Sequence, residues 1–137
     1  MLIPKKVKHR KWHKGRARNK RMASDKIELA FGQHGLKALT SSWVSSRQIE
    51  AARRVLTRHT RRGGKIWIRI FPDRPVTKKG SEVPMGSGKG AVDHYVSVVK
   101  PGTVMFEMDG VTPEQAIEAL NLARYKLPCR SRVISKE

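Results

Sequence analysis

The sequence predicts an α+β fold in which two helices pack on one side of a mainly antiparallel sheet. Three observations support this expectation. Two segments with helical periodicity each begin with a capping signal, several short segments alternate apolar and polar residues, and a Pro-Gly pair separates two of the predicted strands. The 137 residues suit one domain, which we place at residues 23–137 behind an arm formed by residues 1–22.

The first predicted elements are two short strands and a helix. Alternating residues predict a strand over 27–31, and a second strand over 36–39 follows two glycines. Ser45 and Gln48 have the spacing of a capping box. A helix should therefore begin there and run to about Arg62, where a pair of glycines stops it.

This helix has two contrasting faces. Three apolar side chains share one face at helical spacing: Ile49, Ala52 and Leu56. Arginines occupy a narrow arc nearly opposite, with Arg62 at its flank: Arg47, Arg54, Arg58 and Arg61. We expect the apolar face to pack on the core and the arginines to form an exposed ridge, called the arginine ridge below.

A third strand is expected over residues 65–71, which alternate with period two. Its apolar face carries Ile66, Ile68 and Ile70. Its other face is basic and aromatic and carries Lys65, Trp67, Arg69 and Phe71. Residues 72–92 then contain three prolines, four glycines and few core candidates, so we expect an extended loop there. Loops of this length are usually functional or disordered.

The remaining elements are a hairpin, a helix and a closing strand. Segments 94–99 and 103–108 flank Lys100-Pro101-Gly102, which suits a type II turn and predicts a hairpin. Thr112 is the expected N-cap of the second helix, with Pro113 at its first position and Gln115 completing a capping box. The apolar stripe of this helix is Ala116, Leu120, Ala123 and Leu127. Residues 130–135 are expected to close the sheet.

The charge distribution points to a polyanionic partner. The chain has 30 Lys and Arg against 11 Asp and Glu, a formal net charge of +19 and a pI near 11.0. The whole excess lies before residue 101, and residues 1–22 contain ten basic residues and no acidic one. Nucleic acid is the leading partner because so large a surplus repels itself in a compact state, and an anionic membrane surface is the weaker rival. For the arm, a solvated tail and a mitochondrial targeting peptide are the alternatives.

Several classes of chemistry lack their residues in this sequence. No apolar run is long enough to span a bilayer, and the first residues do not resemble a secretory signal. The Gly-rich segment 85–90 has the spacing of neither a Walker loop nor a dinucleotide fingerprint. The five histidines and the single Cys129 form no metal-ligand pattern, and Cys129 is expected to be a small buried thiol rather than a nucleophile. We therefore expect no enzyme activity, no cofactor and no metal.

What the sequence does offer is recognition by charge and by aromatic faces. Arginine binds phosphate with two prongs and stacks on bases, so the arginine ridge suits structured RNA. Trp12 is expected to contact RNA and Trp43 to be a core residue, while Trp67 fits either role equally. The segment 85–90 is interpreted as a thin basic finger supported by Lys78, Lys79 and Lys89, with a flexible glycine linker as the alternative.

Several sequence runs closely resemble one family, the sixteenth protein of the bacterial-type large ribosomal subunit, which is shared with the archaeal and eukaryotic large-subunit protein ten. The runs keep the family's order over nearly the full length. The most specific are Arg47-Gln48-Ile49-Glu50-Ala51 in the helix and Lys65-Ile66-Trp67-Ile68-Arg69 in the strand. Others are residues 4–5, 10–16, 31–32, 35–38, 62–64, 70–75, 85–90, 100–102 and 107–111. One departure is Pro84, where many bacterial members have an arginine before the Met-Gly pair.

The resemblance implies an α/β-hammerhead type of fold and a structural protein bound to 23S-type rRNA beside the A-site tRNA cleft, near 5S rRNA. It implies roles in late subunit assembly and in aminoacyl-tRNA accommodation, with A-site tRNA and neighbouring ribosomal proteins as partners. The protein would reside in a bacterial-type cytoplasmic or an organellar ribosome, with no membrane contact and no homo-oligomer.

Carried over residue by residue, the resemblance places contacts on four parts of the chain. The candidate rRNA-binding residues are Lys5, Lys6, Lys8, Arg10, Lys11, Trp12, His13, Lys14, Arg16, Arg18, Arg47, Arg54, Arg58, Arg61, Arg62, Lys65, Trp67 and Arg69. The candidate A-site loop residues are Lys78, Lys79, Met85, Gly86, Gly88, Lys89 and Gly90. Two other function classes remain: a general nucleic-acid binder, which the charge alone fits, and a small RNA-modifying enzyme, which lacks a catalytic cluster.

Overall fold

The computed structural model describes residues 2–15, 21–61 and 63–136, and it contains two antiparallel sheets and two helices. The larger sheet has the strand order β3-β6-β1-β7, formed by β3 (Lys65–Ile68), β6 (Val104–Asp109), β1 (His34–Ala38) and β7 (Ser131–Ser135). The smaller sheet has the order β2-β5-β4, formed by β2 (Ser42–Ser45), β5 (Ala91–Val99) and β4 (Arg74–Lys78). The α+β class expected from the sequence is confirmed.

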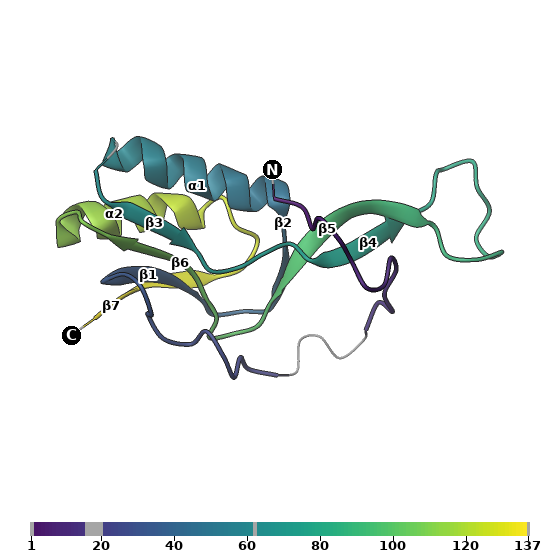
Figure 1. Ribbon diagram of the computed structural model, residues 1–137, viewed down its shortest axis with the longest axis horizontal. Helices are drawn as coiled ribbons and strands as arrows, with labels where there is room; N and C mark the ends of the chain where they lie inside the picture. The colour runs from purple at the N-terminus through teal and green to yellow at the C-terminus, as the bar shows by residue number, and fades with distance from the viewer. Residues whose placement is uncertain (1, 16–20, 62, 137) are drawn as a thin grey trace.

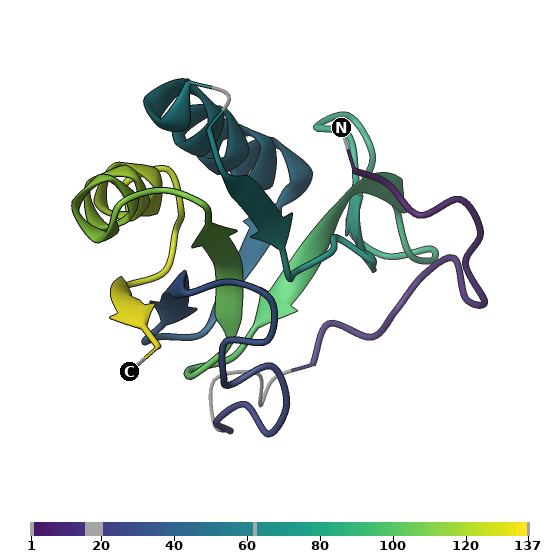
Figure 2. The same cartoon turned by 60° about the vertical axis from the view of Figure 1, so that its left-hand side comes forward.

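Both helices lie on one face of the larger sheet, side by side (Figures 1 and 2). The helix α1 (Ser46–Thr60) begins with the predicted capping box, in which Ser45 accepts from the Gln48 N–H and Gln48 accepts from the Ser45 N–H. The helix α2 (Pro113–Arg124) is capped by Thr112, whose hydroxyl accepts from the Gln115 N–H at 3.3 Å. Each cap satisfies a helix N–H that has no partner within the helix.

The core lies between the two helices and the larger sheet. The apolar face of α1 and the stripe of α2 are buried as predicted, and Phe106 and Met108 of β6 face them with no exposed area. The largest fully buried side chains include Phe106, Leu36, Ile49, Leu56, Met105 and Leu120. This packing fixes α1 firmly enough that its opposite face is a rigid support for the arginine ridge.

The smaller sheet carries the most extended feature of the molecule. β4 and β5 form a long hairpin that projects away from the helices, and residues 79–90 connect them at its far end (Figure 1). The loop predicted at residues 72–92 is thus shorter than expected, because its first part forms β4. Pro75 did not prevent this pairing because β4 is an edge strand, where a missing N–H is tolerated.

Two further predictions about strands were wrong. Residues 27–31 form no strand, because the Ala30 and Phe31 N–H groups donate to the Glu107 carboxylate instead of to a neighbouring strand. The predicted hairpin around Pro101 is also absent. The turn itself forms, with Gly102 at φ +97° and the Thr103 N–H donating to the Lys100 carbonyl at 3.2 Å. However, β5 belongs to the smaller sheet and β6 to the larger one, so the turn passes the chain between sheets.

The strand β2 was not predicted, and the other remaining elements agree with the prediction within a few residues. β1 and β7 lie at the expected places, and β3 ends at Ile68 rather than continuing to residue 71. The helix α1 ends at Thr60, and its C-cap Arg61 adopts the left-handed conformation with φ +49°, in place of the expected glycine stop. No helix within the described ranges is both long and apolar enough to cross a membrane.

Candidate nucleic-acid interface

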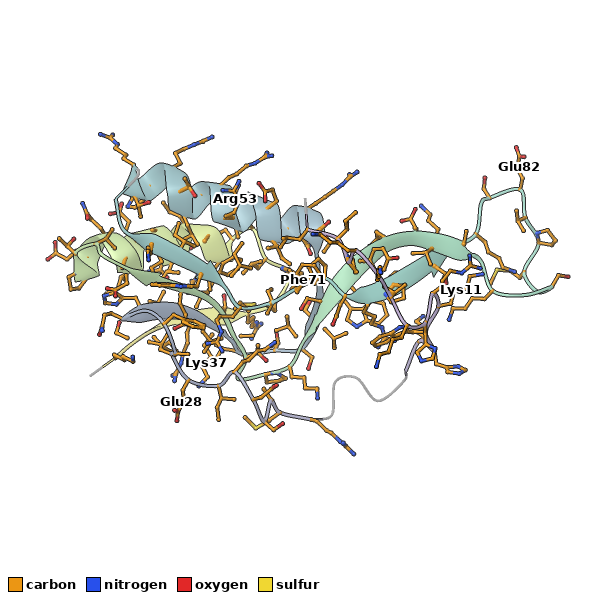
Figure 3. All side chains as sticks on the ribbon, viewed as in Figure 1. Lys11, Glu28, Lys37, Arg53, Phe71 and Glu82 are labelled. Atoms are coloured by element: carbon orange, nitrogen blue, oxygen red, sulfur yellow. The ribbon has the colours of Figure 1, made fainter. Side chains whose placement is uncertain are left out.

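The arginine ridge lies on the exposed side of α1. Arg47, Arg54, Arg58 and Arg61 are all exposed. Figure 3 shows nitrogen-tipped side chains projecting from the side of α1 that faces away from the sheets. Among residues 2–15, 21–61 and 63–136, no carboxylate lies within ion-pair distance of Arg47, Arg58 or Arg61. These three guanidinium groups therefore keep their donors available for an external anion. Arg62 lies outside the described residues.

One acidic residue moderates the charge of this helix. Glu50 accepts from Arg53 Nε at 3.1 Å and lies 3.4 Å from Arg54 Nε. The hydrogen bond from Arg53, assisted by the charges of Arg53 and Arg54, holds the pKa of Glu50 below its ordinary value. Arg53 is thus committed to an intrahelical pair, while the Arg54 side chain remains 70% exposed.

The basic and aromatic face of β3 was expected to contact RNA, but part of it packs within the protein. Trp67 stacks on Phe31, with ring centroids 5.9 Å apart and planes 18° from parallel. The Arg69 guanidinium lies 5.2 Å from the Phe31 ring centre and donates to Glu107 at 2.6 Å. Lys65 is exposed. Arg69, which the resemblance placed among RNA-binding residues, is therefore engaged inside the protein, and one face of Trp67 is covered.

Glu107 organises this region and was not predicted as important. Its side chain is fully buried, and one carboxylate oxygen accepts from the N–H groups of Ala30, Phe31 and Gly32 at 2.8, 3.0 and 3.1 Å. Burial by itself raises the pKa of Glu107, but these three N–H groups and Arg69 outweigh it and hold the pKa below its ordinary value. The sequence signal that could have indicated this role is the position of Glu107 as an acidic residue inside the apolar run of β6.

The N-terminal arm contacts the β4–β5 hairpin at a junction centred on Arg74. The Arg74 guanidinium lies 5.5 Å from the Trp12 ring centre and 4.9 Å from the Trp43 ring centre. The same group donates to the carbonyls of His13 at 2.6 Å and Lys14 at 2.5 Å. Arg74 was not among the predicted contact residues, although it lies in the family-like run 70–75, because its partners are about 30 and 60 positions away in the chain.

Two lysines strengthen this junction from both sides. Lys89 donates to the Trp12 carbonyl, and Lys11 donates to the Lys89 carbonyl at 3.2 Å. Lys11 lies beside the hairpin in Figure 3. The other predicted arm residues up to position 15 are exposed: Lys5, Lys6, Lys8, Arg10, His13 and Lys14. Arg16 and Arg18 lie outside the described residues.

The loop at the far end of the hairpin presents mainly backbone. Residues 81–89 are all exposed, and the Met85 side chain reaches 93% exposure. Gly86 and Gly88 have φ values of +107° and +102°, with no atom within 4 Å of the position a Cβ would take. Lys79 donates to the Gly86 carbonyl at 2.5 Å, which curls the loop, and Gly90 packs closely on Lys78 and Lys79. The tip of the loop is therefore exposed and has little side-chain bulk at its glycines, and the prediction that it serves as a basic finger remains a prediction.

Comparison with known proteins identifies the family of this chain. Residues 4–134 match the profile of the family described as Ribosomal protein L16p/L10e. The chain belongs to the ribosomal protein L16p/L10e family. It is 56% identical over 137 residues to "Large ribosomal subunit protein uL16c" of Phaeodactylum tricornutum and to "Large ribosomal subunit protein uL16" of Trichodesmium erythraeum. Both alignments cover 100% of this chain and 98% of the relative. The uL16c protein of Cyanidium caldarium is 55% identical, with 96% of its length covered.

Membership of the L16p/L10e family makes this protein a structural ribosomal component rather than a member of an enzyme family. Its relatives come from bacterial and plastid ribosomes, so the family works in the cytoplasm or in an organelle. The Cys129 thiol agrees with a structural role, since it is 6% exposed, lies 3.6 Å from the Met105 sulfur and has its pKa raised by burial. Among the residues placed by the structure, no cluster of His, Cys, Asp and Glu could hold a metal ion.

Proposed function

We propose that this protein binds large-subunit rRNA beside the A-site tRNA cleft, near 5S rRNA, and supports subunit assembly and aminoacyl-tRNA accommodation. The observation that carries the proposal is the arrangement of exposed cations on α1, on the arm and on the hairpin, where Arg47, Arg58 and Arg61 meet no carboxylate within the described part of the chain. A protein whose cations lie on rigid, widely separated supports can hold several phosphate backbones at fixed distances.

The arginine ridge would supply the most specific phosphate contacts. Arg47 and Arg58 are exposed on a helix whose other face is anchored in the core. A guanidinium donates two parallel hydrogen bonds to a phosphate, and a helix support fixes where each fork points. The ridge therefore favours an RNA helix packed along α1 over loosely held single strands.

The hairpin loop would act at a distance from the main RNA contacts. It extends beyond the body of the protein, and Glu82 marks its far end in Figure 3. Glycines at its tip leave the backbone free to approach another backbone closely. We propose that this loop reaches toward the A-site tRNA, with Lys78, Lys79 and Lys89 supplying charge. Pro84 removes the arginine that many relatives place there, so these lysines would carry that charge alone.

Co-sedimentation with large subunits across a salt gradient tests the proposal. The purified chain would be added to large subunits stripped of this protein, and bound and free fractions measured as salt rises. We expect the variant Arg47→Gln/Arg58→Gln to leave at lower salt, with the slope of log affinity against log salt falling by about 0.7–0.9 for each lost phosphate contact.

The matched control is Arg130→Gln/Arg132→Gln, which removes the same charge from two exposed arginines outside the proposed interface. Equal release of both double variants would contradict a specific role for the arginine ridge. Equal affinity for duplex DNA and for the stripped subunit would favour general nucleic-acid binding over a ribosomal site.

A further inference from the structure

The junction between the arm and the hairpin is unusual in its charge. Four basic residues contribute to it: Lys11, Arg74 and Lys89 through side-chain hydrogen bonds, and Lys14 through its carbonyl and as part of the lining of a hollow. All the hydrogen-bond acceptors that Lys11, Arg74 and Lys89 use there are backbone carbonyls, those of Trp12, His13, Lys14 and Lys89. A carbonyl satisfies a donor but cancels no charge. The fold therefore gathers positive charge at this place without neutralising it within the residues that the structure describes.

A hollow opens at the same place. It has a volume of about 300 Å³ and is lined by Trp12, Lys14, Trp43, Arg74 and Lys89, together with residues 75–77 of β4. The Trp12 side chain is 43% exposed although Arg74 covers part of its ring. A hollow of this size admits a single nucleotide, and an exposed indole beside cations is the usual surface on which an unpaired base stacks.

Arg74 differs from the other cations because its donors and both sides of its guanidinium are already used. It lies against two indole rings and donates to two carbonyls of the arm. Such a group contributes little to binding a ligand directly, but it holds the arm against β2 and β4. Lys14 differs in the opposite way, because it lines the hollow and its carbonyl accepts from Arg74, while its ammonium makes no hydrogen bond or ion pair with the residues that the structure describes.

We propose that Arg74 is a positioning residue that fastens the N-terminal arm to the hairpin before RNA arrives, and that the hollow so formed binds a backbone phosphate of single-stranded RNA. The inference rests on the proposed rRNA-binding function and adds a defined subsite to it. Fastening the arm in advance lowers the ordering cost that a free arm would meet on binding. The phosphate would lie between Lys14 and Lys89, with the adjoining base on Trp12.

The first measurement needs no RNA, so its outcome is independent of the ribosomal function. Trypsin would be used to cleave the folded full-length chain after Arg10 and Lys11, and the cleavage rate followed by mass spectrometry. Arg74→Lys keeps the charge but loses the planar fork, and Pro75 after it keeps trypsin from cutting there in either protein. We expect arm cleavage to become about tenfold faster in Arg74→Lys, because two cation–π contacts and a forked hydrogen bond are lost. Arg130→Lys, the matched control, should cleave in the arm at the wild-type rate.

The second measurement is binding of an eight-nucleotide oligouridylate to the same variants. We expect Lys14→Gln to retain slow cleavage after Arg10, since the carbonyl of residue 14 remains, yet to bind several-fold more weakly with a salt slope lower by about 0.7. Arg74→Lys should also bind more weakly despite its unchanged net charge. Inorganic phosphate in excess should compete in the wild type and less in Lys14→Gln.

Three results would overturn the inference. Wild-type cleavage in Arg74→Lys would refute the fastening role. Wild-type oligouridylate binding in Lys14→Gln would refute the phosphate site. Equal affinity for a duplex of the same length would refute the single-stranded assignment. Failure of the chain to join stripped large subunits would instead count against the proposed function and leave the cleavage result standing.

Discussion

Replacing Glu107 by Gln should destabilise the protein more than any other single loss of charge. The carboxylate is fully buried, accepts from three backbone N–H groups and pairs with Arg69 at 2.6 Å. Glutamine keeps one oxygen acceptor in place but removes the negative charge, so Arg69 loses its partner and the three N–H bonds lose their charge assistance.

The expected magnitude follows from these contacts. Breaking a buried ion pair by removing one partner costs about 3–5 kcal/mol. The Arg69 side chain is 15% exposed and recovers some hydration, so the lower end of that range applies. We expect a loss of about 3 kcal/mol in the free energy of unfolding, which for a chain of this length lowers Tm by roughly 10 °C.

The pH dependence gives a second, independent signature. Because the folded-state pKa of Glu107 lies below its ordinary value of 4.5, its contribution is fully present above that value and is lost as pH falls through the folded-state pKa. The stability gap between wild type and Glu107→Gln should thus be constant from pH 7 down to about pH 5 and narrow at lower pH.

Urea unfolding followed by circular dichroism at several pH values measures both effects. The control is Glu82→Gln, which removes one carboxylate from the exposed loop and should change stability by less than about 0.5 kcal/mol. A Glu107→Gln protein as stable as this control, or a stability gap that persists unchanged at pH 3, would refute the reasoning.

Three further predictions concern the ridge, a glycine and the loop. Arg58→Gln should leave Tm within about 1 °C of wild type but lower the salt slope of large-subunit rRNA-fragment binding by about 0.7–0.9, measured by filter binding from 0.05 to 0.3 M salt. Gly64→Ala should lower the free energy of unfolding by more than about 2 kcal/mol, because φ is +74° and a Cβ would lie 2.4 Å from the Asp109 carbonyl oxygen. Thermal unfolding measures this loss. The control is Gly80→Ala, where φ is not positive and the atom nearest to an added Cβ is 3.9 Å away. Deleting residues 80–88 should leave Tm and subunit binding unchanged but slow single-round dipeptide formation on the resulting ribosomes, and an unchanged rate would contradict a role for the loop in tRNA accommodation.

Local signals predicted the helices well because the information they need is local. The capping box of α1 and the Thr112 cap of α2 lie within four residues of the groups they satisfy, and helical spacing places Ile49, Ala52 and Leu56 together without reference to other segments. The positions of β1, β3 and β7 were also predicted to within a few residues, whereas β2 and β4 were not predicted and residues 27–31 form no strand. The resemblance to a ribosomal family, carried by the runs in α1 and β3, is confirmed by the family match over residues 4–134.

Strand partners were predicted less well, because pairing depends on segments that are distant in the chain. The Pro101-Gly102 turn formed as expected, yet the strands on its two sides joined different sheets. A turn specifies only that the chain changes direction, whereas a hairpin also requires that the two flanking strands pair with each other rather than with other strands. β5 pairs with β2 and β4, and β6 lies between β3 and β1, so both strands were already flanked on each side.

The same distinction decides which cations are free to bind RNA. From the sequence, Arg69 and Arg47 were both expected to bind RNA, since each was predicted to lie on a basic face of a regular element. The structure separates them: Arg69 meets a carboxylate 38 positions away, Arg74 meets carbonyls about 60 positions away, and Arg47 meets no acidic partner among the described residues. A cation paired with an internal carboxylate, as Arg69 is with Glu107, has its charge cancelled within the fold, whereas a cation that meets no carboxylate keeps its charge for a ligand. The net charge of +19 therefore overstates the number of cations that can bind RNA, because it includes those already paired within the fold. The change in the salt slope of RNA binding in each single variant measures which cations contact phosphate.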